Sequence, residues 1–171
     1  MVMQTTAKLY AYGYADVRTY LFAALFVVGN VLLPQLVHLI PQGGLTWLPI
    51  YFFTLVGAYK YGWRVGVLTA VVSPIVNALL FDMPAVASLP GIMVKSVLLA
   101  VAAGYAAHRY QKASLWLLLA VVTFYQVAGT AFEWLMGGSL YAAMQDFRLG
   151  LPGMAVQVFG GYGVINRFIV R

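Results

Sequence analysis

The chain lacks cysteine and is poor in charge. Its 171 residues include no Cys, only four Asp and Glu together, and 8% charged residues overall. Without cysteine, disulfide bonds and thiol catalysis are excluded. A soluble domain carries about 25% charged residues, whereas this chain is 63% hydrophobic. The composition therefore predicts an integral membrane protein.

Common catalytic motifs are also missing. There is no HExxH zinc motif, no G-x-S-x-G elbow, no pair of carboxylates spaced for acid–base work, and no phosphate-binding P-loop. No second histidine or acid is spaced with His38 to bind a metal. We expect a protein that is not an enzyme, needs no cofactor or metal, and cannot drive transport with its own nucleotide hydrolysis.

Apolar runs divide the chain into helical segments. A transmembrane helix needs roughly 20 mostly apolar residues. We expect an all-α integral membrane protein, a single domain over residues 1–171, with six transmembrane helices and both termini in the cytoplasm. The expected helices are about 19–40, 45–59, 65–81, 84–108, 115–136 and 151–170. Between the last two, the segment 137–151 opens with Gly-Gly and is amphipathic enough for a short interfacial helix or lid.

The orientation follows from the lysines and arginines. Eight of the ten basic residues fall on one side of the expected bundle: Lys8, Arg18, Lys60, Arg64, Arg109, Lys112, Arg167 and Arg171. Cytoplasmic loops are enriched in such residues. Because the basic residues lie at helix ends, the net charge of +6 indicates membrane topology and contact with lipid, and no nucleic acid is expected as a partner.

Lys95 stands within the apolar run 84–110. A lysine at that depth costs about 2.5–3.5 kcal/mol on insertion scales, so it either reaches out to the headgroups or faces a partner inside the bundle. Gln126, Thr130 and Glu133 have helical spacing that puts them on one face. The expected substrate-binding residues, all in the outer half of the membrane, are Lys95, Glu133, Gln126, Thr130, Asn77, Gln157, Trp47 and His38.

Purely structural roles stay open for several of these residues. Lys95 and Glu133 also suit a structural ion pair, Trp47 suits an interfacial aromatic belt, and His38 suits a hydrogen-bonded residue at the membrane edge. In the inner half, small residues spaced for close helix approach predict a partner-docking surface or, alternatively, internal packing. They are Gly62, Gly66, Ala70, Ala103 and Gly104.

Two stretches carry a family resemblance. GGLTWLPIYFFTLVGAYKYGWRVGVLTAVVSPIVNALLF (43–81) and LPGIMVKSVLLAVAAGYAAHR (89–109) resemble the second to fourth helices of substrate-specificity (S) subunits of energy-coupling factor (ECF) vitamin transporters. The family's usual Ala-x-x-x-Ala row on the first helix is missing, which leaves the docking face open.

The resemblance implies a membrane subunit of a prokaryotic cell that binds a small water-soluble vitamin or precursor in its outer half. It also implies a transmembrane coupling subunit and two ATPase subunits as partners. The alternative is a structural membrane protein of the rod-shape-determining type, which has a similar size and layout and transports no ligand.

Overall fold

A computed structural model describes residues 9–167, and within this range the chain is all-helical. Four helical segments are long and apolar enough to cross a membrane. They are α1 (Val17–Val37), α4 (Trp63–Phe81), the run Val86–Tyr110 made of η2 (Val86–Ser88) and α5 (Leu89–Tyr110), and α6 (Leu115–Leu135). Lys8, Arg171 and positions 168–170 of the expected last helix lie outside the described residues.

Local signals explain where the long helices begin. The Asp16 side chain accepts a hydrogen bond from the Arg18 backbone N–H at 3.0 Å, which caps the start of α1 two residues before the expected position 19. At the start of α4, Gly62 has φ +104°, a conformation that side chains with a Cβ rarely adopt, so the turn before α4 requires glycine.

The second expected helix, 45–59, is not continuous. The structure has α2 (Gly43–Trp47), the 3₁₀ turn η1 (Pro49–Tyr51) and α3 (Phe52–Tyr61) in its place. Leu48 between them is left-handed, with φ 46°. The residue before a proline is disfavoured in the right-handed helical region, and Pro49 has no N–H to donate. This Leu-Pro step therefore corrects the prediction of one helix.

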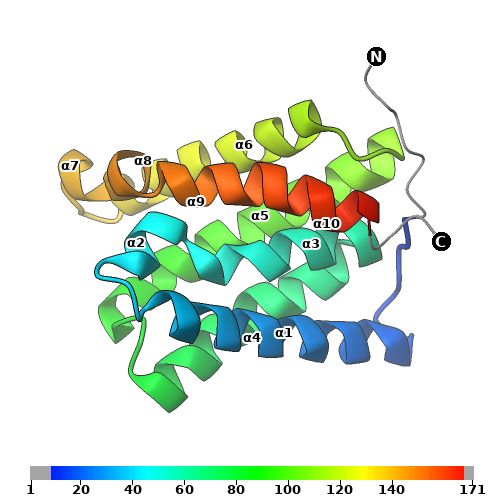
Figure 1. The fold of residues 1–171 in the computed structure, drawn as a ribbon, viewed down its shortest axis with the longest axis horizontal. Helices are drawn as coiled ribbons and strands as arrows, with labels where there is room; N and C mark the ends of the chain where they lie inside the picture. Colours follow the sequence, from blue (N-terminus) through cyan, green and yellow to red (C-terminus); the bar gives the residue numbers. More distant parts are fainter. Residues whose placement is uncertain (1–8, 168–171) are drawn as a thin grey trace.

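The last expected helix is also modified. It consists of α9 (Leu151–Ala155), a π-helical turn η3 (Val156–Gly160) and α10 (Gly161–Arg167), and it runs along the bundle beside α3 and α6 (Figure 1). The segment before it folds into two short helices, α7 (Leu140–Ala143) and α8 (Gln145–Leu149).

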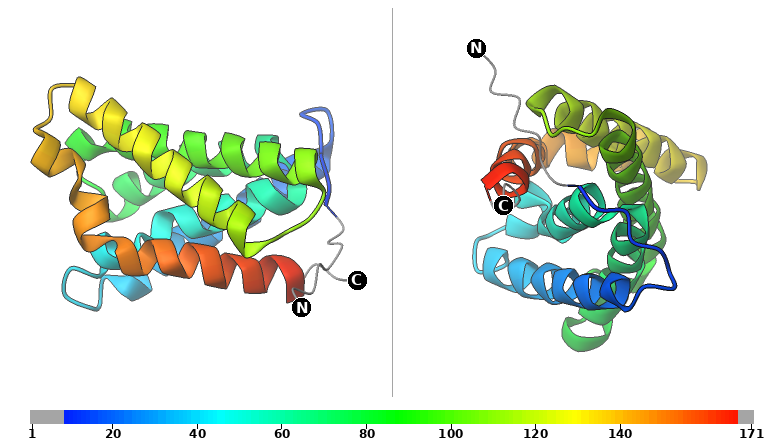
Figure 2. Two further views of the ribbon diagram at one scale, coloured as in Figure 1. Left: turned by 90° about the horizontal axis from the view of Figure 1, so that it is seen from above. Right: turned by 90° about the vertical axis from the view of Figure 1, so that its right-hand side faces the viewer.

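The helices lie roughly side by side, with their connections at two opposite ends (Figures 1 and 2). The α1–α2 and α4–α5 connections and α7–α8 share one end. The α3–α4 turn, the α5–α6 connection, the start of the described chain and the end of α10 share the other. Those of the eight basic residues on the expected cytoplasmic side that the structure describes lie at this second end.

A buried polar network ties α1 to α3 and α4. Asn30 Nδ2 donates to Thr54 Oγ1 at 3.0 Å and to Ser73 Oγ at 3.3 Å, while its Oδ1 accepts from the Phe53 backbone N–H at 3.1 Å. Asn77 Nδ2 donates to the Asn30 backbone oxygen at 2.9 Å. Asn77, expected in the substrate site, therefore holds helices together, because its donors are already used inside this network.

The small residues of the inner half pack inside the chain. A Cβ on Gly66 would overlap Ala58 of α3, and one on Gly104 would lie 2.5 Å from Trp63 Cβ. Ala70 and Ala103 are fully buried and Gly62 forms the α3–α4 turn. Four of these positions, Gly66, Ala70, Ala103 and Gly104, are buried, so the internal-packing interpretation describes them, whereas Gly62 stays partly exposed in its turn.

We expect Gly66→Ala to lower the free energy of unfolding by about 1–3 kcal/mol, because the added methyl group forces α3 and α4 apart. Thermal unfolding of the purified protein in detergent measures this. Gly163→Ala is the matched control, since a Cβ there meets nothing within 4 Å, and it should be neutral or slightly stabilising. Equal stability of Gly66→Ala and wild type would contradict internal packing at Gly66 and favour a role in partner docking.

Candidate functional site

A charged cluster joins three helices. Lys95 Nζ of α5 lies 2.7 Å from Glu133 Oε2 of α6 and 2.8 Å from Asp146 Oδ2 of α8. The Lys95 side chain is only 3% exposed, against 28% for Glu133 and 14% for Asp146. Lys95 therefore faces the bundle interior and does not reach out to the headgroups. One cation stands against two carboxylates, so the cluster carries a formal charge of −1.

Two glycines make room for these side chains. A Cβ on Gly129 of α6 would overlap the aliphatic stem of Lys95, and a Cβ on Gly91 of α5 would lie 2.6 Å from Glu133 Oε1. Each helix thus supplies a glycine opposite the ionic side chain of the other. The close fit holds the Lys95 stem in place between α5 and α6.

A second set of polar groups lies next along α6. Tyr125 Oη donates to Gln157 Oε1 at 2.8 Å and accepts from Gln126 Nε2 at 3.0 Å. All three side chains are buried, and the Tyr51 ring lies 5.4 Å from the Tyr125 ring. Gln157 belongs to the π-helical turn η3, a local irregularity that often accompanies functional sites.

Three atoms in this region have no hydrogen-bond partner among the described residues. They are Gln126 Oε1, Thr130 Oγ1 and Gln157 Nε2. A buried polar atom without a partner costs free energy, and most such atoms in native proteins are paired. Together they offer an acceptor, a hydroxyl and a donor, which a small polar molecule could satisfy.

The charged and the uncharged groups follow one another along α6. Gln126, Thr130 and Glu133 share a helix face, and the stem of Lys95 crosses that helix at Gly129, between them. We call Lys95, Tyr125, Gln126, Thr130, Glu133, Asp146 and Gln157 the polar cluster.

The other predicted site residues lie elsewhere. His38 Nδ1 donates to the Pro34 carbonyl oxygen at 2.6 Å, and its ring packs against Gly44, so it connects α1 to α2. The Trp47 side chain is 39% exposed, and its backbone packs on Gly153 of α9. His38, Trp47 and Asn77, which belongs to the network around Asn30, therefore contribute no hydrogen bond to the polar cluster among the described residues.

Two members of the polar cluster were not among the predicted site residues. They are Asp146 and Tyr125. The signal for Asp146 was present, because an ammonium has three N–H donors and Glu133 and Asp146 are the acids in the outer half besides Asp82. Which loop folds back onto Lys95 was not readable from spacing.

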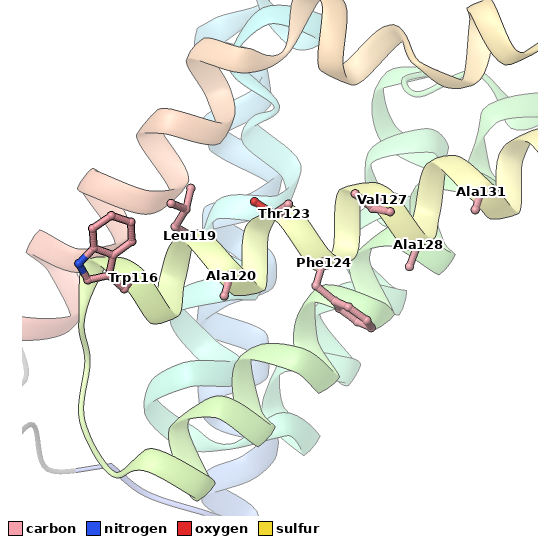
Figure 3. Close-up of a pocket in the computed structure, with 8 residues that line it drawn as sticks. All are labelled: Trp116, Leu119, Ala120, Thr123, Phe124, Val127, Ala128 and Ala131. Carbon is pink, nitrogen blue, oxygen red and sulfur yellow. The ribbon is translucent and has the colours of Figure 1, made fainter.

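Another face of α6 is different in character. A shallow groove there is lined by residues with helical spacing, among them Trp116, Phe124 and Val127, and Figure 3 shows their side chains distributed along the length of α6. Trp116 is 78% exposed and Thr123 is the one polar side chain in the groove. This apolar face suits contact with lipid, so it adds nothing to the polar cluster.

We expect Lys95→Met to lower the free energy of unfolding by about 3 kcal/mol, because it leaves two carboxylates close together without a cation. The triple variant Lys95→Met/Glu133→Gln/Asp146→Asn should recover most of that loss. Thermal unfolding in detergent compares them, with Arg148→Met of the exposed α8 surface as a control that removes a cation elsewhere. A triple variant no more stable than Lys95→Met would contradict charge compensation as the reason for the cluster.

Comparison with known proteins gives one match. Residues 17–166 match the sequence model of a family described as "ECF transporter, substrate-specific component". No curated protein and no solved structure matches the chain. The match covers most of the chain and all of the polar cluster, and it favours transport over the structural alternative. The chain belongs to the substrate-specific components of ECF transporters, which are multi-pass proteins of prokaryotic cell membranes and act as transport subunits, not as enzymes.

Proposed function

We propose that the polar cluster is the substrate site and that it captures a small water-soluble vitamin or vitamin precursor. The observation that carries this proposal is the set of three buried, unpartnered polar atoms on Gln126, Thr130 and Gln157 next to a buried ion cluster. In an apolar bundle such groups are costly unless a ligand satisfies them. A purely structural network would resemble the one around Asn30, whose side-chain amide groups are hydrogen-bonded.

The charge balance narrows the substrate further. Lys95 is already neutralised by two carboxylates, so a substrate anion would add a third negative charge unless Asp146 moved away. Two of the three Lys95 N–H donors are used, which leaves one for an acceptor. A neutral ring with an acceptor atom for Lys95 and matching groups for the two glutamines fits better than a carboxylated molecule. The Tyr51 and Tyr125 rings offer such a molecule flat apolar faces.

Access to the site involves the short helices α7 and α8. They follow Gly137, whose φ of +95° marks a sharp turn after α6, and Asp146 connects α8 to Lys95. We propose that this segment acts as a lid. Breaking the ion pair between Lys95 and Asp146 would admit a substrate without disturbing the packed stem of Lys95.

We also propose six membrane crossings, with both termini in the cytoplasm. The four candidate spans, the α2–α3 run and the α9–α10 run would be the six. The asymmetry of basic residues supports this orientation, as does the position of both described chain ends at one end of the bundle (Figure 1). Lys95 is six residues, about 9 Å, from the start of α5 at Leu89, so the orientation puts it in the outer half.

The topology can be tested with reporter fusions. A reporter that is active only in the cytoplasm should be active when fused at Lys60 or Lys112, and one that is active only outside should be active at Gln42 or Ser139. The physical reason is that Lys and Arg are retained on the cytoplasmic side during insertion. The opposite result at either pair would exclude this arrangement.

The partners follow from family membership together with chemistry. Members of the family work with a substrate and an ECF module. Because this chain has no P-loop, we propose that a transmembrane coupling subunit and two ATPase subunits supply the energy. The buried small residues of α4 and α5 are not available for docking, which leaves the exposed apolar helix faces as the candidates.

Substrate binding can be tested first by thermal-shift screening of the purified protein against water-soluble vitamins and their precursors. For the compound that binds, Lys95→Met should weaken affinity roughly ten- to a hundred-fold, since one charge-assisted hydrogen bond is worth about 1.5–3 kcal/mol. Arg109→Gln, which removes an exposed cation at the other end of the bundle, should bind like wild type. Equal affinity of Lys95→Met and wild type would remove Lys95 from the substrate site.

A further inference from the structure

The basic end of the bundle holds a single acidic side chain. All four acidic residues of the chain lie in the described part. Glu133 and Asp146 belong to the polar cluster, and Asp82 follows the far end of α4. Asp16 alone lies at the basic end, and it is held by Arg18 through bonds of 2.8 to 3.1 Å to its guanidinium. These bonds lower the pKa of the Asp16 carboxyl, so it stays ionised as the partner of Arg18.

Arg64 is left without a carboxylate among the described residues. Its guanidinium carbon lies 4.9 Å from the centre of the Trp63 ring and 5.6 Å from that of Tyr14. Aromatic rings attract a cation but supply no negative charge to neutralise it. His108, Arg109 and Lys112 at the end of α5 have no carboxylate partner in the described chain either. An anionic group of another molecule could therefore pair with Arg64 at this end.

A pocket of about 530 Å³ lies beside Arg64. Three segments form it: the stretch 9–12, the start of α4 and the last turns of α5. Backbone bonds from Tyr10 N to Lys60 O at 2.8 Å and from Tyr12 N to Tyr61 O at 3.2 Å hold the first segment across the end of the bundle (Figure 2, right). No acidic residue lines the pocket.

The lining of this pocket is amphipathic. Arg64 and His108 provide N–H donors at the end of the bundle, and Val101 and Tyr105 continue the wall along α5 toward the middle of the bundle. Val101 is 47% and Tyr105 65% exposed, so the apolar part opens sideways, where the bilayer surrounds a membrane helix. A free anion would use only the basic part, whereas a phospholipid uses both.

We propose that this pocket binds one anionic phospholipid of the leaflet at the basic end. Its phosphate lies at Arg64 and His108, and an acyl chain follows Val101 and Tyr105. Basic pockets between membrane helices bind acidic headgroups in this way, and each Lys or Arg near the membrane surface contributes about 1 kcal/mol. The lipid phosphate supplies an anionic partner for Arg64, and the lipid holds the stretch 9–12, α4 and α5 together at this end.

The test uses delipidated full-length protein in a neutral detergent, titrated with dioleoyl phosphatidylglycerol or dioleoyl phosphatidylcholine, with bound lipid counted by native mass spectrometry. We expect phosphatidylglycerol to bind at least about five-fold more tightly, the effect of one basic side chain. Arg64→Gln should remove most of this preference. Arg109→Gln, which loses the same charge on an exposed site outside the pocket, should keep it.

A second pair of variants tests the acyl chain. Val101→Trp fills the apolar part of the pocket and should weaken binding of both lipids, while Val127→Trp, on the similarly exposed face of α6, should not. These variants keep the proposal testable even if Arg64→Gln does not fold.

Four results would overturn the proposal. Equal affinity for the two lipids would do so, as expected if the pocket instead takes a protein segment, and so would an equal loss of lipid preference in Arg64→Gln and Arg109→Gln. Normal lipid binding by Val101→Trp would contradict the acyl-chain site, and displacement of phosphatidylglycerol by 10 mM inorganic phosphate would show a site for the free anion.

Discussion

The structure of this subunit depends on how one buried lysine is neutralised. An ammonium group inside an apolar bundle is costly, and Lys95 avoids that cost only because Glu133 and Asp146 both approach within 2.8 Å. That requirement brings α5, α6 and α8 together. It also explains two glycines, because Gly91 and Gly129 leave the space in which these side chains lie. A larger residue at either position would separate the charges that stabilise each other.

The two buried polar regions of the bundle differ in how completely they are hydrogen-bonded. Around Asn30, side-chain amides, hydroxyls and a backbone N–H are paired between α1, α3 and α4. In the polar cluster, Tyr125 links two glutamines but leaves Gln126 Oε1 and Gln157 Nε2 without partners in the described chain. This contrast supports the proposal that the polar cluster, and not the Asn30 network, receives the substrate.

The α7–α9 region connects the polar cluster to the break between α2 and α3. Asp146 of α8 contacts Lys95, and Gly150, at the end of α8, lies where a Cβ would be 2.7 Å from the side chain of Leu48. Gly153 packs on the Trp47 backbone. A movement of α8 away from Lys95 would therefore change contacts on the irregular α2–η1 segment as well. The proposed lid and the shape of this end of the bundle are linked through these contacts.

Composition and spacing alone determined much about this protein. The high hydrophobic content and scarce charge indicated a helical membrane protein, since only helices satisfy their backbone groups within a chain segment in lipid. The period of 3.6 residues placed Gln126, Thr130 and Glu133 on one face, and the cost of burying a charge singled out Lys95. These are local properties, and they can be read from neighbouring residues.

Tertiary structure decided which of the polar residues meet. Asn77 lies at a depth similar to the polar-cluster residues but faces α1. Successive residues of a helix are rotated by about 100°, so two residues at one depth can face different neighbours. Likewise, small residues on α4 and α5 fit a partner or a neighbouring helix equally well until the position of Ala58 and Trp63 is known. Asp146 joined Lys95 across 51 residues of sequence, a contact produced by folding of the chain between them, and no local pattern encodes it.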